Sequence, residues 1–143
     1  MPSGASGAAQ REAARLASLI FFLDHQIGRY QVAAALRAAG VKVEVHLDHF
    51  SGDAQDSEWI PEVASRGWVL ITKDQHIHRN PLERAAYESA KLRGFVVTGK
   101  DMNANELSEL LITCLPGMVR RCAGRTGPLL FTISRYGVFR KLL

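Results

Sequence analysis

The sequence predicts an α/β fold: a single three-layer αβα domain with a mainly parallel sheet of four to five strands and a C-terminal hairpin. Short apolar runs of strand length alternate with segments of helical periodicity, which is typical of right-handed βαβ units. The chain has 143 residues, which leaves little room for a second domain. Apolar residues make up 47% of it and charged residues 22%, which excludes the composition of a disordered protein.

The first 18 residues are expected to form a leader outside this domain. Residues 1–10 are rich in Gly, Ser and Ala, which is typical of a flexible segment, and residues 11–18 have the pattern of a short helix. The domain itself is expected to span residues 19–143. Its longest apolar run, residues 19–23, is too short for a membrane span and lacks the flanks of a secretory signal. We therefore expect a cytoplasmic protein.

The start of the domain predicts two strands with a helix between them. Residues 19–23 have the continuous apolar pattern of a strand buried on both faces, and this run stops at Asp24. Apolar residues at helical spacing predict a helix over 28–39, which Gly40 ends. Valines then alternate with polar residues over 41–47, which predicts a half-exposed strand near an edge of the sheet.

The middle of the chain predicts two helices around one buried strand. The first helix begins at Asp56 or Ser57, either of which is a suitable N-cap, and the apolar run at 68–72 follows it as a strand. The segment NPLE at 80–83 has the N-cap, first-turn proline and capping-box acid of a helix start. This second helix is expected to run until Gly94 ends it.

The last third predicts a strand, a long helix and a hairpin. Residues 95–98 have the pattern of a fourth buried strand. Asn103 or Asn105 is a suitable cap for a helix with an apolar face reaching Met118, which Pro116 is expected to bend or shorten. The two β-patterned runs on either side of residues 135–137 predict a terminal hairpin.

Charge is unevenly divided along the chain. Every acid lies at or before Glu109, so the last 34 residues carry +6 and the rest of the chain carries −2. A basic end beside a carboxylate-rich body suits nucleic acid or an acidic protein partner, although basic tails are also common as solvated surface. Cys114 and Cys122 lack CxxC spacing, so we expect neither a disulfide framework nor a cysteine zinc site.

Four aspartates follow the four predicted strands directly or within three residues: Asp24, Asp48, Asp74 and Asp101. Parallel strands end at one edge of a sheet, where the functional crevice of such folds lies. Clustered carboxylates repel each other unless cations compensate, and hard oxygen ligands suit Mg²⁺ or Mn²⁺. A single Asp after a strand is most often structural, but the set predicts a metal site. Asp24 and Asp74 are its strongest members because they end the most buried strands.

The acids Asp56 and Glu58 have two interpretations. As structure, Asp56 caps its helix and Glu58 lies in the positive first turn. As function, one of the two supplies a third metal ligand, and one residue can serve both purposes. The spacing does not separate these interpretations.

Three segments in this order resemble the compact PIN-like domains of VapC-type toxins from toxin–antitoxin pairs. They are FFLDHQI at 21–27, DAQDSEWI at 53–60 and VLITKD at 69–74, and the resemblance covers roughly residues 19–142. It implies a metal-dependent ribonuclease with Mg²⁺ or Mn²⁺ as cofactor, RNA as substrate and an antitoxin protein as partner, with a homodimer also open and no membrane association. Water activated by the metal would attack the phosphate and leave a 5′-phosphate and a 3′-hydroxyl.

The same resemblance assigns site residues. The acidic cluster of the family corresponds to Asp24, Asp74 and an acid of the pair Asp56 and Glu58, and Asp101 stands after the fourth strand in the place of the fourth acid. From the residues themselves, we expect a set of basic side chains that flank the crevice to contact phosphates, namely Lys73, Arg79, Lys100, His76 and His78.

Some side chains have a structural interpretation that outweighs the functional one. Trp59 and Tyr136 are candidates for base stacking, but Trp59 sits at a core-like helical position. The histidine pairs His46/His49 and His76/His78 have little support as a zinc site, because they form no helical HxxxH and have no cysteine pair.

Two other functions remain open. A receiver-like signalling module would use Thr98 and Lys100, but it requires an adjacent acid pair after the first strand, and His25 follows Asp24. The second open function is a PIN-like domain that binds RNA or protein without cleaving RNA. The sequence contains no GxxxxGK[ST], GxGxxG or GxSxG motif, which disfavours nucleotide-dependent motors, dinucleotide enzymes and serine hydrolases.

Overall fold

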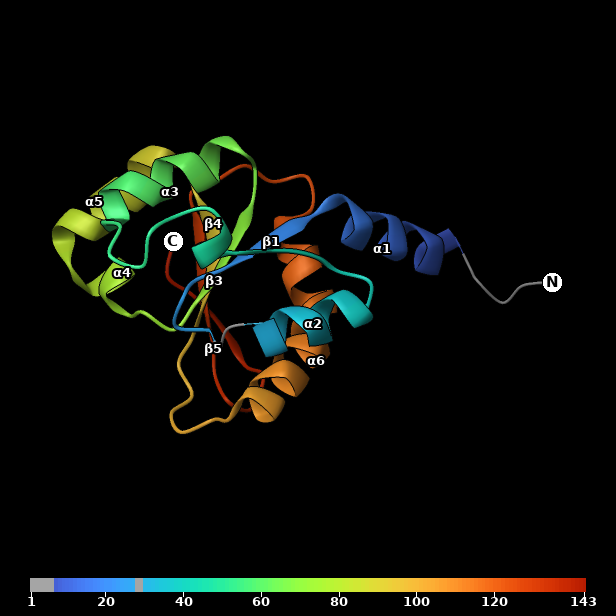
Figure 1. Ribbon diagram of the computed structural model, residues 1–143. Helices are drawn as coiled ribbons and strands as arrows, with labels where there is room; N and C mark the ends of the chain where they lie inside the picture. The colour runs from blue at the N-terminus through green and yellow to red at the C-terminus, as the bar shows by residue number, and fades with distance from the viewer. Residues whose placement is uncertain (1–6, 28–29) are drawn as a thin grey trace.

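A six-stranded sheet in the order β2-β1-β3-β4-β5-β6 forms the centre of the computed structural model, which describes residues 7–27 and 30–143 (Figure 1). Five strands are parallel, and β6 pairs with β5 in the antiparallel direction. The strands are β1 (Ile20–Leu23), β2 (Lys42–Val45), β3 (Val69–Thr72), β4 (Arg93–Val97), β5 (Leu129–Ile133) and β6 (Phe139–Lys141). The predicted α/β fold, the edge position of the second strand and the terminal hairpin are confirmed.

Helices cover both faces of this sheet, with α3 and α5 on one side and α2 and α6 on the other (Figure 1). The helices are α1 (Gly7–Ser18), α2 (Tyr30–Ala38), α3 (Asp56–Ser65), α4 (His76–Arg79), α5 (Pro81–Ala90) and α6 (Ala104–Cys122), and a short 3₁₀ helix η1 (His46–Asp48) follows β2. Across the described part of the chain, no helix combines the length and apolarity that a membrane crossing requires.

The buried strands explain the continuous apolar runs of the sequence. On β1, Phe21 and Leu23 pack into the core beneath α2 and α6, while Phe22 between them packs into the core beneath α3 and α5. On β3, Val69 packs into the core beneath α2 and α6, and Leu70 packs into the core beneath α3 and α5. Successive side chains of a strand point to opposite faces, so a strand covered on both faces needs apolar residues at every position.

Gly94 lies inside β4, so the prediction that it ends the preceding helix is wrong. Helix α5 ends at Ala90, and Lys91 takes the left-handed backbone conformation (φ 59°) that terminates it. A Cβ atom at Gly94 would lie 2.8 Å from the Tyr87 hydroxyl and 3.1 Å from the Leu70 Cβ. The Tyr87 hydroxyl lies next to Gly94 and donates a hydrogen bond to the Leu129 carbonyl. The glycine is therefore required by close packing in the strand.

Pro116 does not shorten α6, which continues to Cys122. The helix begins with a reciprocal capping box, in which Asn103 accepts from the Glu106 backbone N–H and Glu106 accepts from the Asn103 backbone N–H. Pro116 lies on the exposed side, while the apolar face on both sides of it is buried in the core. Tertiary packing thus outweighs the single hydrogen bond that proline removes.

The ends of two predicted segments fall outside the described residues. Of the predicted leader, residues 1–6 lie outside, and residues 7–18 form α1, which lies against α6. The first two residues of the predicted helix over 28–39 also lie outside the described residues, and α2 corresponds to the rest of that prediction.

We expect Gly94→Ala to lower the free energy of unfolding by about 1–3 kcal/mol, because the added methyl group overlaps Leu70 and Tyr87 in a filled core. Urea denaturation followed by circular dichroism measures this change. Gly52→Ala is the matched control, since a Cβ at Gly52 meets only the Leu47 side chain at an ordinary 3.6 Å. Equal stability of the two variants would contradict the packing role of Gly94.

Candidate functional site

Asp24 and Asp74 lie side by side at the carboxyl ends of the neighbouring strands β1 and β3. The backbone N–H of Asp24 donates to the Ile71 carbonyl at 3.0 Å, which continues the pairing of the two strands. Thr72, the fully buried last residue of β3, donates its hydroxyl to Asp24 Oδ2 at 2.7 Å. The same hydroxyl oxygen accepts the backbone N–H of Asp74 at 2.9 Å. One side chain thus fixes both acids.

The first group of potential metal ligands consists of Asp24, His25 and His46, which offer ligand atoms within 4.8 Å of one another. Asp24 is buried, and its Oδ1 accepts the His25 backbone N–H at 2.7 Å and lies 2.9 Å from His25 Nδ1. His46 begins η1, directly after β2. Burial lowers the pKa of His46, and the nearby Asp24 carboxylate opposes this effect. His46 is therefore favoured in its neutral form.

The second group consists of Asp56, Asp74 and Glu83, whose carboxylate oxygens also lie within 4.8 Å of one another. Asp56 is the first residue of α3 and accepts a hydrogen bond from Trp59 Nε1 at 3.0 Å. Asp74 accepts the backbone N–H of His76 at 2.9 Å, and His76 Nδ1 lies 3.2 Å from the same oxygen. Glu83 comes from the first turn of α5.

The electrostatics of this second group favour a bound cation. The pKa of Glu83 is raised to about 7 by burial, by a hydrogen bond with Asp56 and by the negative charges of Asp56 and Asp74. Glu83 Oε2 is buried and has no hydrogen-bond partner within the described residues. A buried carboxylate oxygen without a donor, beside two further carboxylates, fits a hard divalent cation such as Mg²⁺ or Mn²⁺.

Of the acids expected from the sequence, the structure places Asp56 and Asp74 in one ligand group and Asp24 in the other, with Thr72 joining Asp24 to Asp74. Three others, Asp48, Glu58 and Asp101, are exposed and join neither group found in the described ranges. The Tyr30 hydroxyl donates a hydrogen bond to Asp48 at 3.1 Å.

Gln55 is the N-cap of α3, and its side chain makes no capping hydrogen bond, so the interpretation of Asp56 as a helix cap is wrong. Asp56 is the first helical residue, and its carboxylate lies with those of Asp74 and Glu83.

Glu83 is the site residue that sequence reasoning missed. The sequence NPLE assigned it to a capping box, but Asn80 caps α5 through its own side chain, which accepts the Leu82 and Glu83 backbone N–H groups at 2.9 and 3.3 Å. The Glu83 carboxylate instead faces Asp56 across the contact between α3 and α5. Sequence alone carries no signal for that contact, which arises only when the helices pack.

Three of the five predicted basic residues, Lys73, His76 and Arg79, lie beside Asp74, and Lys100 does not. Lys73 and Arg79 line a hollow of about 360 Å³ together with Asp74 and His76. Lys100 is exposed in the loop after β4, where its carbonyl accepts a hydrogen bond from Arg135 at 2.9 Å.

For the two aromatic candidates for base stacking, Trp59 is only 2% exposed, which confirms its core position, whereas Tyr136 is 85% exposed.

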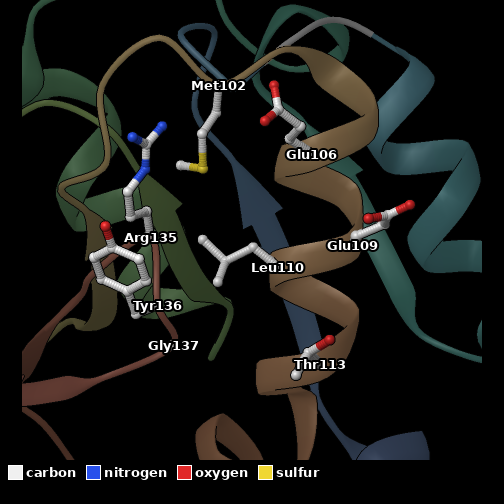
Figure 2. A pocket seen from close by; sticks show the side chains of 8 residues that line it. All are labelled: Met102, Glu106, Glu109, Leu110, Thr113, Arg135, Tyr136 and Gly137. Carbon is white, nitrogen blue, oxygen red and sulfur yellow. The ribbon is translucent and has the colours of Figure 1, made fainter.

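The basic C-terminal segment is partly structural. The Arg121 guanidinium carbon lies 4.0 Å from the centre of the Phe139 ring and 5.2 Å from that of Phe131, so this arginine holds the terminal hairpin against α6. A hollow of about 560 Å³ lies between α6 and the turn after β5 (Figure 2). Glu109 and Tyr136 are among the residues that line it, and it contains no member of either ligand group.

Comparison with known proteins identifies related sequences over this region. Residues 19–99 match the family model described as a PIN like domain, and this range includes both ligand groups but not Asp101. The chain is 31% identical over 126 residues to a Mycobacterium tuberculosis protein named "Putative ribonuclease VapC45", covering 85% of this chain and 90% of that protein. No solved structure matches the chain at a significant level.

We expect the metal-free protein to lose stability as the pH rises towards 7. The raised pKa of Glu83 means that, between its ordinary value and about 7, the folded protein holds a proton that the unfolded chain has released. The free energy of unfolding therefore falls through this window. Urea denaturation with a chelator, at about pH 5 and about pH 8, measures the fall.

Glu83→Gln removes this titration, so the variant should be less sensitive to pH than the wild type over the same window and more stable than it at the higher pH. Glu88→Gln, which removes an exposed charge from the same helix, should behave like the wild type. An identical pH dependence of Glu83→Gln and Glu88→Gln would rule out the described environment of Glu83.

Proposed function

The chain belongs to the PIN-like domain family, and we propose that it is a metal-dependent endoribonuclease that acts as the toxin of a toxin–antitoxin pair in the cytoplasm. The relative named as a ribonuclease supports the activity. The observation that carries the proposal is the juxtaposition of Asp24 and Asp74, both held by Thr72, with Asp56 and Glu83 beside Asp74. We assign residues 19–143 to the nuclease domain, with α1 packed against it.

Asp56, Asp74 and Glu83, with Asp24 next to them, are the residues that would hold Mg²⁺ or Mn²⁺. A divalent cation supplies a lowered pKa for water and stabilisation of negative charge on phosphate. The chain itself keeps the carboxylates in place: Thr72 holds Asp24, Trp59 holds Asp56, and the His76 backbone holds Asp74. Preorganised acids of this kind need no rearrangement when substrate arrives.

Lys73 and Arg79 are positioned to bind the RNA backbone. They flank Asp74 in the hollow described above, so a phosphate bound there would lie next to the second ligand group. Arginine binds phosphate with paired donors and lysine binds it as a point charge. The reaction uses water as nucleophile, so the products carry a 5′-phosphate and a 3′-hydroxyl, and the 2′-hydroxyl takes no part.

We expect Asp24→Asn and Asp74→Asn each to reduce cleavage of RNA by about 10²-fold or more, because each removes charge from the preorganised site. A nuclease assay on structured and unstructured RNAs with Mg²⁺ or Mn²⁺ measures this loss, and circular dichroism checks the fold. Glu58→Gln and Asp101→Asn are matched controls from exposed positions outside both groups, and they should keep wild-type activity. Full activity of Asp74→Asn would refute the assignment.

Divalent cations should raise the melting temperature of the protein, because a ligand that binds only the folded state stabilises it. At a cation concentration of 100 Kd the gain is about 2.7 kcal/mol. Differential scanning fluorimetry with Mg²⁺ or Mn²⁺ measures it. The rise should be smaller in Asp74→Asn and unchanged in Glu58→Gln. An equal rise in all three proteins would place the cation elsewhere.

A further inference from the structure

His46 is a buried polar side chain whose hydrogen-bonding capacity is not used. It is only 1% exposed, and neither ring nitrogen has a hydrogen-bond partner in the described part of the chain. The ring lies between Phe22, Phe50 and Trp59, with centroid distances of 5.8, 5.6 and 5.8 Å. A buried donor or acceptor that lacks a partner costs about 1–3 kcal/mol. A phenylalanine would fill the same aromatic cluster without that cost.

Aromatic packing therefore does not explain a histidine at this position, and a ligand does. Asp24 and His25 offer ligand atoms within 4.8 Å of those of His46. These two side chains also pair with each other, with His25 Nδ1 at 2.9 Å from Asp24 Oδ1. The His25 side chain is 43% exposed, which gives an ion a route from solvent to the buried atoms of Asp24 and His46.

We propose that Asp24, His25 and His46 form a binding site for a divalent transition-metal ion, distinct from the carboxylate group of Asp56, Asp74 and Glu83. Two imidazoles and one carboxylate are a donor set for Zn²⁺, Co²⁺ or Mn²⁺, whereas Mg²⁺ prefers oxygen ligands alone. Affinity should follow the order Mn²⁺ < Co²⁺ < Zn²⁺ for nitrogen-containing sites. Three protein ligands leave a coordination position open for water or a phosphate oxygen.

A hydrogen bond from a neighbouring side chain orients Asp24, as is usual for carboxylates that bind metal. The Thr72 hydroxyl donates to Asp24 Oδ2, which leaves Oδ1 on the side of His25. Hydrogen bonds of this kind orient ligand carboxylates. The site shares Asp24 with the proposed nuclease centre, but its existence does not require that the protein cleave RNA.

The test is direct metal binding by the full-length protein after removal of metal with a chelator. Co²⁺ is the spectroscopic probe, because coordination by imidazole gives visible absorption bands, and calorimetry with Zn²⁺ gives the affinity. We expect the wild type to show Co²⁺ bands that Zn²⁺ displaces and excess Mg²⁺ does not. His46→Phe should lose the bands and bind Zn²⁺ at least about tenfold more weakly, while its melting temperature without metal is unchanged or higher.

His25→Ala, a substitution at an exposed side chain, provides a second variant that should lose affinity without affecting the fold. His49→Gln is the matched control, because it removes a histidine from the same loop that joins neither ligand group. Asp56→Asn tests the other group and should leave the Co²⁺ bands intact. Co²⁺ bands that persist in His46→Phe would overturn the proposal. This holds also where Asp56→Asn abolishes the bands.

The nuclease function and the transition-metal site can fail independently of each other in these experiments. Co²⁺ bands that depend on His46 in a protein that cleaves no RNA would refute the nuclease function and support the transition-metal site. Cleavage with Mg²⁺ in a protein that shows no His46-dependent bands would support the nuclease function and refute the transition-metal site.

Discussion

The hydroxyl of Thr72 is the interaction on which the rest of the site depends. It donates to Asp24 and accepts from the backbone of Asp74, so one fully buried oxygen sets the relative positions of two acids that are 50 residues apart in the chain. The register of β1 against β3, with Leu23 opposite Ile71, brings Asp24 level with Thr72, and Asp74 follows two residues later. A buried polar group that is satisfied on both sides adds specificity as well as stability.

This arrangement concentrates negative charge, and the helices of the same layer partly offset it. Asp56 is the first residue of α3, and Glu83 lies in the first turn of α5. Backbone N–H groups at a helix N-terminus favour nearby carboxylates. The offset is incomplete, since Glu83 keeps a pKa raised to about 7. The fold therefore maintains an unfavourable concentration of charge at one edge of the sheet, which is typical of a binding site.

The sequence predicted those parts of the site that follow from strand ends. Asp24 and Asp74 each follow a continuous apolar run, and parallel strands place such residues at one edge, so their proximity followed from local pattern alone. The roles of Glu83 and Gly94 depend on how α5 lies over the sheet and against α3. The local sequence pattern instead suggested that Glu83 is a capping acid and that Gly94 ends a helix. His46 was visible only as half of a histidine pair with His49, because burial without a hydrogen-bond partner is a tertiary property.

The strand order explains why Asp24, a member of the first ligand group, lies next to the second group. In the order β2-β1-β3, Asp24 after the central β1 has His46, which follows β2, on one side and Asp74, which follows β3, on the other. The β2 side is lined by aromatic rings and provides imidazole nitrogens, while the β3 side is lined by helix starts and provides carboxylates. The two proposed sites, for a softer and a harder cation, therefore lie on either side of Asp24. Because Thr72 joins Asp24 to Asp74, the residues that distinguish the two chemistries are the flanking ones, which lie on separate elements.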